Sequence, residues 1–344
     1  MIFNSFDFFI LGFTSFILTI ILTPLMRMLA IRANFMDVPN LKRKTQQTPV
    51  PYLGGVAISI SISATVYVAI LFSNYSSKTV LLATSVLVPA FFMAIVGLVD
   101  DLVSMKPQVK LLTQLLAAIS VSLVLIITKT SSLWDFSKYI GLVVTIGWVV
   151  GLVNAVNFFD NHDGASTSVV SIVSFFSFLI SIYGGQYFIA ALSLVICTST
   201  AAFYFWNKYP AKIYMGDTGA LYLGALMATV TIRIKPIELP ITKSIFVITM
   251  LISIFILDSS VAVISRLARG KSPMIGGKDH LSHRLVRMGW SKVETAHALQ
   301  VLSAIFGAFA MATVLTETWV VIILYLATFA LLFKVFYSIE HEDS

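Results

Sequence analysis

The sequence predicts an all-α, polytopic integral membrane protein, on the basis of its composition and its hydropathy pattern. Of the 344 residues, 58% are hydrophobic and only 11% are charged, whereas about one quarter of the residues in ordinary soluble domains are charged. The mean hydropathy is +0.92. Apolar runs of about 20 residues, the length that crosses a bilayer, recur from end to end with short polar breaks. These breaks leave no room for a soluble domain, so we expect one transmembrane domain over residues 1–344.

The apolar runs predict about eleven transmembrane helices. The first run has no basic segment before it and no small-residue cleavage motif after it, so we expect a retained helix rather than a signal peptide. The predicted helices cover residues 8–30, 52–74, 80–99, 109–128, 138–156, 165–183, 188–206, 218–235, 243–265, 296–315 and 319–338.

Charge differs between alternate loops, and this difference predicts the orientation. Lysine and arginine favour cytoplasmic loops, so the basic loops belong in the cytoplasm, with the N-terminus outside and the 340–344 tail inside. The basic set comprises Arg27, Arg32, Lys42, Arg43, Lys44, Lys106, Lys110, Lys208, Lys212, Arg266, Arg269, Lys271, Lys278, Arg284, Arg287 and Lys292. The opposite set has only Lys78, Lys129, Lys138, Arg233, Lys235 and Lys243.

Composition also excludes several classes of function. The net charge of +7 could suggest nucleic-acid binding, but the cations fall at helix ends, where they orient a membrane protein, rather than along one stripe. Cys197 is the lone cysteine, which excludes an intramolecular disulfide and a zinc site built on thiolates. No internal repeat suggests the inverted halves of a transporter.

The polar motifs all fall on the predicted cytoplasmic side. Asp100 and Asp101 end the third helix, and Lys110 and Gln114 lie on the next one. Adjacent carboxylates raise each other's pKa unless a cation lies beside them. This pair is either two solvated acids at a helix end, or a magnesium or phosphate site with Lys110 as the counter-charge.

The stretch from Asn154 to Gly164 places two amides and two carboxylates around a glycine turn at a helix exit. Such oxygen ligands suit Mg²⁺ or Mn²⁺, and the amides suit hydrogen bonds to a sugar or a base. An Asx-rich turn that caps the next helix would explain Asp163 but not Asn154 and Asn157. His162 has no partner at metal-ligand spacing, so we interpret it as a loop residue.

Two further motifs flank this region. Asp217, between Gly216 and Gly219, is either the N-cap of the following helix or a metal ligand, and the two roles are compatible. The basic entry to the second helix, with Arg43 and Lys44, is a weak signal that more often marks a membrane anchor.

The loop after the ninth helix is the most polar segment. His280 and His283 beside several cations make a poor zinc site but a good anion site, suited to a nucleotide diphosphate. Asp258 lies inside the ninth apolar run, where an unpaired charge is costly, so we expect it to face the bundle interior and either to have a partner or to mark a break in that helix.

In this order, the motifs resemble those of the polyprenyl-phosphate N-acetylhexosamine-1-phosphate transferases. The resemblance covers residues 43–289 and rests on Pro51 to Gly55, Asp100-Asp101, Asn154 to Gly164, Gly216 to Gly219 and His280 to Arg284. It implies transfer of a sugar-1-phosphate from a UDP-sugar to undecaprenyl phosphate in the bacterial cytoplasmic membrane, with Mg²⁺ and release of UMP.

The chain looks closer to the GlcNAc-1-phosphate branch than to the MurNAc-pentapeptide branch, which usually carries three consecutive histidines. It departs from the usual pattern at Ser282, which lies within the histidine motif, and at Asn161-His162, where Gly-Ile or Gly-Leu is common. These departures leave the identity of the sugar open but not the reaction. The sequence also leaves open the downstream polymer and the oligomeric state, a homodimer included.

Because two anions must meet, we expect neutralisation of charge to dominate catalysis. The lipid phosphate is mostly dianionic at neutral pH, so a strong base is not obligatory. We favour direct attack, although a covalent phosphosugar on a carboxylate and the identity of any base stay open. We assign catalysis to Asp100, Asp101, Asp160, Asp163 and Lys110, substrate binding to Asn154, Asn157, His280, His283, Arg284 and Lys44, and metal binding to Asp217, Asp100 and Asp101.

Two other classes compete with this interpretation. A transporter or lipid flippase would place polar residues at mid-membrane and on both faces. A CDP-alcohol phosphatidyltransferase would carry an Asp-Gly-x-x-Ala-Arg signature with further spaced acids. The residues after Asp163-Gly164 do not continue this signature.

Overall fold

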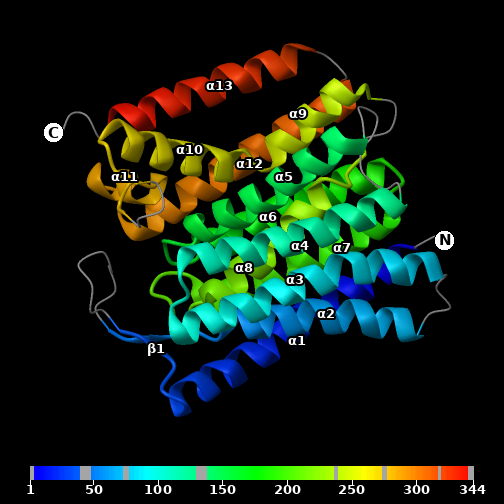
Figure 1. Cartoon of the computed structure of the whole chain (residues 1–344), viewed down its shortest axis with the longest axis horizontal. Helices are drawn as coiled ribbons and strands as arrows, with labels where there is room; N and C mark the ends of the chain where they lie inside the picture. The colour runs from blue at the N-terminus through cyan, green and yellow to red at the C-terminus, as the bar shows by residue number, and fades with distance from the viewer. Residues whose placement is uncertain are drawn as a thin grey trace.

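The computed structural model describes residues 4–38, 48–72, 77–128, 138–235, 239–272, 277–316 and 319–339, and within them the chain is almost entirely helical. The helices lie side by side in one bundle (Figure 1). They are α1 (Ser5–Arg32), α2 (Gly54–Phe72), α3 (Ser77–Val103), α4 (Pro107–Thr128), α5 (Lys138–Phe159), α6 (Ala165–Tyr183), α7 (Tyr187–Asn207), α8 (Gly216–Thr231), α9 (Ile241–Leu251), α10 (Ser253–Ala268), α11 (Leu281–Arg287), α12 (Lys292–Thr316) and α13 (Trp319–Ser338).

One small departure from the all-α prediction lies between α1 and α2. Strands β1 (Met36–Asp37) and β2 (Val50–Pro51) pair antiparallel, with Met36 opposite Pro51. The pair fixes the chain that enters α2 and does not change the fold class.

The described helices confirm a polytopic membrane protein but not the predicted count of about eleven spans. Nine of them are long and apolar enough to cross a membrane, or up to 10 if a bent pair counts as one span. The difference lies at two places. The predicted helix 243–265 is a pair, α9 and α10, bent by 72°, and α8, with 16 residues, is only about 24 Å long.

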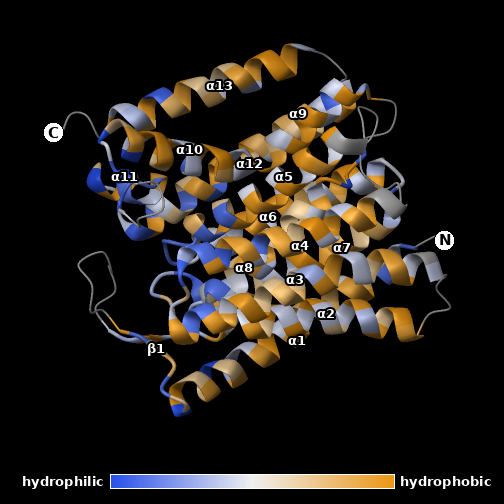
Figure 2. Cartoon of the chain, in the orientation of Figure 1, coloured by the Kyte–Doolittle hydropathy of each residue, from blue (hydrophilic) through white to orange (hydrophobic). Residues whose placement is uncertain are grey.

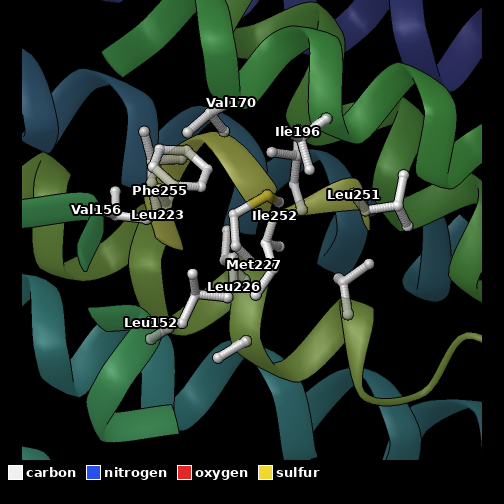
Figure 3. Packing of buried hydrophobic residues seen from close by; sticks show 14 of the residues in the cluster. Leu152, Val156, Val170, Ile196, Leu223, Leu226, Met227, Leu251, Ile252 and Phe255 are labelled. Atoms are coloured by element: carbon white, nitrogen blue, oxygen red, sulfur yellow. The ribbon is translucent and has the colours of Figure 1, made fainter. Parts of the chain in front are cut away.

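Helix α8 lies in the middle of the bundle (Figure 1), and every residue from Thr218 to Thr231 is buried. It packs against α3 and α5 and, over a smaller area, against α2. Figure 3 shows the apolar core at this place, with Leu223, Leu226 and Met227 of α8 among Leu152 and Val156 of α5, Val170 of α6, Ile196 of α7 and Phe255 of α10.

Glycines allow this close packing, because a small residue lets two helix backbones approach each other. A methyl group added at Gly55 of α2 would overlap the backbone nitrogen of Gly219 in α8. A methyl group at Gly97 of α3 would overlap the carbonyl oxygen of Asp217. Both contacts lie at the beginning of α8, so they fix the position of Asp217.

Hydrophilic residues gather at one end of the bundle, around β1, the beginning of α8 and α11 (Figure 2). Helix α1 begins at the opposite end, whereas α13 ends on the hydrophilic side (Figure 1). The sequence motifs therefore meet at one end of the helices, as predicted.

Candidate active site

The site is built from helix ends that meet at the hydrophilic end of the bundle. The last turn of α3 supplies Asp100 and Asp101, the first turns of α4 supply Lys110, and the end of α5 supplies Asn157. Asp217 is the second residue of α8. Five side chains that are far apart in the sequence thus form one cluster, which we call the acid cluster together with Asp160.

Lys110 is the centre of this cluster. Its Nζ donates to Oδ2 of Asp100 at 2.8 Å and also pairs with the Asp217 carboxylate. Asn157 Nδ2 donates to Oδ1 of Asp217 at 2.9 Å. The side chain of Asp217 is 32% exposed, against 12% for Asp100 and 17% for Lys110. Of these three groups, Asp217 is therefore the most accessible to a ligand.

Asp101 has a different role, because its carboxylate caps α8 from outside that helix. Oδ1 accepts from the backbone N–H of Asp217 at 2.9 Å, and Oδ2 accepts from the N–H and the hydroxyl of Thr218 at 3.0 and 2.8 Å. The first N–H groups of a helix lack intrahelical partners, and a carboxylate satisfies them well. The prediction that Asp217 itself is the N-cap is wrong, since α8 begins one residue before it and has no side-chain cap of its own.

Gly216 and Tyr52 complete this arrangement. Gly216 has a φ of +66°, and a methyl group there would lie 2.6 Å from Oδ2 of Asp101. The Tyr52 hydroxyl donates to the backbone carbonyl of Asp101 at 3.2 Å. The contributions of Thr218 and Tyr52 were not foreseen from the sequence, although both residues lie within the motifs.

Asp160 follows α5 and makes no side-chain hydrogen bond or ion pair with the described part of the chain. Burial raises its pKa well above the usual value, and the nearby carboxylates of Asp217 and Asp101 raise it further. The acid cluster thus holds four carboxylates, and Lys110 is the one described cation that pairs with them. A bound cation would stabilise four carboxyl groups held this close together, because it favours their ionised forms.

The cluster fits a magnesium ion that shares its coordination with a substrate. Among the described residues, no group of three or more His, Cys, Asp or Glu side chains is arranged as a complete metal site. Mg²⁺ typically takes one or two protein carboxylates, and phosphate oxygens and water complete the shell. The accessible Asp217 and the unpartnered Asp160 offer such a partial set of ligands.

Two predicted site residues have structural partners instead. Asn154 and Gln114 exchange hydrogen bonds of 2.7 and 3.2 Å between α5 and α4, and the second amide hydrogen of Asn154 goes to the Val150 carbonyl. Oδ2 of Asp163 accepts from the N–H of Ala211 at 3.0 Å, and the carboxylate also bonds Tyr214, which holds the α7–α8 loop. Asp163 does not cap α6, whose N-cap Gly164 has no side-chain partner.

The loop between α10 and α11 is held by buried ion pairs. Asp258 is 1% exposed and accepts from His280 Nδ1 at 2.8 Å, which confirms that it has a partner inside the bundle. Asp279 pairs with Arg266 and Arg269 at 2.6 and 2.5 Å. Burial acts to raise the pKa of Asp279, but the two guanidinium groups hold it at about 2.

Arg284 belongs to the same buried arrangement. Its guanidinium donates to the carbonyls of Asp279 and Phe336 at 2.8 and 2.7 Å and to the Ser265 hydroxyl at 2.6 Å, and its side chain is completely buried. This placement does not support direct binding of a phosphate by Arg284. It connects the loop to the end of α13.

His283 is the histidine of this loop that keeps an unused nitrogen. Its Nδ1 is buried and has no hydrogen-bond partner in the part of the chain that the structure describes. Burial and, to a smaller extent, His280, whose ring centre is 6.0 Å away, together lower its pKa to about 4. The ring is therefore neutral at pH 7 and can donate or accept a hydrogen bond. It is not one of the cations that the sequence suggested for an anion site.

Two contacts that the sequence did not predict join the loop between α5 and α6 to α11 and α12. Ser282 donates a short hydrogen bond to Oδ1 of Asn161, the neighbour of Asp160. His162 Nε2 bonds the backbone carbonyl of Lys292 at 2.8 Å, which agrees with its interpretation as a loop residue. Asn161 and Ser282 are the positions at which the sequence departs from the usual family motif. This shared departure is the sequence signal that could have indicated their contact.

Lys44, predicted to bind substrate, lies outside the described residues.

Comparison with known proteins points to one family. A sequence model described as "Glycosyl transferase family 4" matches residues 83–235, which include the whole acid cluster. The chain is 30% identical to "Probable undecaprenyl-phosphate N-acetylglucosaminyl 1-phosphate transferase" of Bacillus subtilis, over 89% of this chain and 84% of the relative. It is also 30% identical to "Phospho-N-acetylmuramoyl-pentapeptide-transferase" of Halalkalibacterium halodurans, over 89% of this chain and 96% of the relative. A third relative, "Decaprenyl-phosphate N-acetylglucosaminephosphotransferase" of Mycolicibacterium smegmatis, is 27% identical over 82% of this chain and 76% of its own length.

Proposed function

Because the chain belongs to glycosyl transferase family 4, we propose that it transfers GlcNAc-1-phosphate from a UDP-sugar to undecaprenyl phosphate and releases UMP. The printed names of two relatives support a polyprenyl phosphate acceptor and an N-acetylglucosamine phosphate donor. The observation that carries the proposal is the acid cluster itself. Four carboxylates and one lysine at the hydrophilic end of a membrane bundle suit a reaction between a nucleotide diphosphate and a lipid phosphate.

We propose that the protein lies in a bacterial cytoplasmic membrane, with the acid cluster toward the cytoplasm and the N-terminus outside. The distribution of lysine and arginine supports this orientation. A prenyl chain can stay in hydrocarbon while its phosphate reaches residues at the end of the helices. UDP-sugars are water-soluble, so they would arrive at the same end from the aqueous side.

The reaction forms one bond and breaks one. An oxygen of the lipid phosphate attacks the phosphorus that bears the sugar, and the bond from that phosphorus to UMP breaks, so that the product is a lipid-diphosphate-sugar. Both partners are anions, so neutralisation of charge is the main requirement. Bound Mg²⁺ would supply positive charge at the diphosphate, with Asp217 and Asp160 as its protein ligands and Asp100 and Asp101 nearby.

The chain's own residues then have distinct tasks. Lys110, held between Asp100 and Asp217, presents a fixed positive charge to phosphate oxygens. Asn157 keeps the Asp217 carboxylate oriented through its amide. Neutral His283, on α11 beside His280, would offer a hydrogen bond to the departing UMP or to the sugar. Since a phosphate monoester has its second pKa near ~6, most acceptor is deprotonated at neutral pH, and we favour direct attack without a protein nucleophile.

The first test is UMP release by the purified protein in nanodiscs. We expect release only when UDP-GlcNAc, undecaprenyl phosphate and Mg²⁺ are all present, and a chelator should abolish it. Replacing UDP-GlcNAc by UDP-MurNAc-pentapeptide separates the two branches, because we expect transfer from the former alone.

Asp217→Asn removes the negative charge but keeps the shape of the side chain. We expect turnover to fall by at least about a hundredfold, because the loss of one preorganised electrostatic group commonly costs that much. Glu294→Gln, a matched change at an exposed carboxylate in the first turn of α12, should keep full turnover. Wild-type turnover in Asp217→Asn would show that this carboxylate does not hold the metal.

A further inference from the structure

A group of cations and aromatic rings lies where α1 and α7 end, at the hydrophilic end of the bundle. It consists of Arg27 on α1, Phe205 and Trp206 on α7, and Lys208 and Lys212 in the loop that leads to α8. We call these five residues the α1–α7 patch. None of them contacts the acid cluster, and the proposed reaction does not use them.

The patch has a defined geometry. Arg27 Nε donates to the backbone carbonyl of Lys212 at 3.0 Å, which joins the α7–α8 loop to α1. The ammonium of Lys208 lies 5.9 Å from the centre of the Phe205 ring, and that of Lys212 lies 5.7 Å from the Trp206 ring. Such distances allow a cation–π attraction. The charge of each lysine is therefore held beside an aromatic ring.

The positive charge of the patch is not neutralised by the described part of the chain. The ion pairs found there engage Lys110, Arg266, Arg269 and His280, and none engages Arg27, Lys208 or Lys212. Asp163, the carboxylate that contacts this loop, is occupied by the N–H of Ala211 and by Tyr214. Lys208 and Lys212 are exposed, and Arg27 is half-buried.

The surroundings of the patch are apolar. Phe205 is 55% exposed, and the neighbouring turns of α1 expose Met28 and Ile31 at 42% and 46%. Aromatic rings with nearby lysine or arginine are typical of the membrane interface, where rings lie at headgroup level and cations meet lipid phosphates. A water-soluble anion would gain nothing from these apolar neighbours, whereas a lipid would use both.

We propose that the α1–α7 patch binds the phosphate headgroup of an anionic phospholipid. The headgroup phosphate lies among Arg27, Lys208 and Lys212, and the acyl chains follow the exposed side chains of α1 and α7. The two lysines lie in the loop that leads from α7 to α8, the helix that carries Asp217, so the bound lipid holds that loop against α1. This surface is separate from the acid cluster, and the acceptor lipid phosphate is not its ligand.

The test compares lipid binding with native mass spectrometry, in micelles that contain phosphatidylglycerol or phosphatidylcholine at equal concentration. We expect the wild-type protein to retain phosphatidylglycerol selectively. The triple variant Arg27→Gln/Lys208→Gln/Lys212→Gln should retain at least fivefold less. The control Lys235→Gln/Lys243→Gln/Lys334→Gln removes the same charge elsewhere and should bind as the wild type does. Equal retention by the patch variant and the wild type, or an equal loss in the control, overturns the proposal.

Two further measurements keep the result specific. Lys208→Arg/Lys212→Arg preserves the charge and should bind phosphatidylglycerol as the wild type does. In a background in which the other four tryptophans are replaced by Phe, brominated phosphatidylglycerol should quench the fluorescence of Trp206, and the triple variant should lose this quenching. The KM for undecaprenyl phosphate should stay within twofold of the wild-type value in the triple variant. A large rise in that KM, with unchanged retention of phosphatidylglycerol, would assign the patch to the acceptor and overturn the proposal. Lipid binding is measured without a UDP-sugar, so its outcome does not depend on the proposed transferase activity.

Discussion

Adjacent Asp100 and Asp101 show how two identical side chains acquire different roles. Asp100 accepts from Lys110, ten residues later, within the acid cluster. Asp101 satisfies the first N–H groups of α8, 116 residues later in the chain. The sequence predicts that both carboxylates lie at a helix end. Their division into one that faces the cluster and one that caps α8 depends on packing between distant helices.

The contact between Asn161 and Ser282 can be tested with a double-mutant cycle. We expect Asn161→Ala and Ser282→Ala each to raise the KM for UDP-GlcNAc severalfold. Either change removes the hydrogen bond that joins α11 to the residue next to Asp160. If the hydrogen bond carries the effect, the KM of the double variant should be little higher than that of either single variant. This corresponds to a coupling free energy of about 0.5–1.5 kcal/mol. Additive effects would show that the bond does not couple the two loops.

His283 predicts a specific dependence of stability on pH. Its pKa in the folded protein is about 4, below the ordinary value of 6.5. Between these two values the unfolded chain binds more protons, so the folded state loses stability as the pH falls from 6.5 toward 4. We expect the unfolding midpoint of His283→Gln to depend less on pH over this interval than that of the wild type. Two parallel curves would contradict the lowered pKa.

Asp279 acts in a separate interval and does not obscure this comparison. Its folded pKa of about 2 lies below the ordinary 3.8. The stability that it contributes is therefore complete above about pH 4 and is lost as the pH falls toward 2. The difference between wild type and His283→Gln above pH 4.5 isolates the imidazole.

At the scale of whole elements, α8 is the unusual helix. It is too short to cross the hydrocarbon unaided, and other helices bury it on all sides. A helix that is apolar on every face looks like any other membrane span in the sequence. This is why hydropathy predicted α8 as an ordinary span. Hydropathy also predicted α9 and α10 as one helix, because the sequence has no polar segment at Ile252, where the chain bends.

The glycine contact between α2 and α8 offers a test of this packing. Gly55→Ala should lower the free energy of unfolding by about 1–3 kcal/mol, because the added methyl group overlaps the backbone of Gly219. It should also reduce turnover, since Asp217 moves with α8. Gly151→Ala in α5 is the matched control, as nothing lies within 4 Å of the added methyl group.

In Gly151→Ala, the better helix propensity of alanine should leave stability unchanged or raise it by about 0.5–1 kcal/mol. Thermal unfolding in detergent measures both variants. A tolerated methyl group at Gly55 would mean that the two helices do not touch there.

At the scale of the whole molecule, polarity at one end of the helices is the property that the sequence predicted best. The prediction of sidedness uses only the alternation of basic and neutral loops. It therefore stays the same when the predicted bounds of a helix are wrong by several residues. The side-chain partners within that end, such as Asp258 with His280 or Asp163 with Ala211, depend on contacts across helices. A single sequence carries no signal for them beyond the presence of the polar residues.

The predicted orientation can be tested by labelling single cysteines in a Cys197→Ser background. In intact cells, a membrane-impermeant maleimide should label Lys235→Cys, at the outer ends of the helices. Lys106→Cys, between α3 and α4, should react only after permeabilisation. Labelling in the reverse order would place the acid cluster outside the cell.

The enclosed position of α8 has a consequence for biosynthesis. Its main neighbours, α2, α3 and α5, all precede it in the chain. When α8 enters the membrane, these neighbours have already been synthesised, so Asp217 can join Asp100, Lys110 and Asn157 before α12 and α13 have been made. The loop with His280 and His283 is translated afterwards and joins an acid cluster that is already complete. The order of translation is thus also the order in which the active site is assembled.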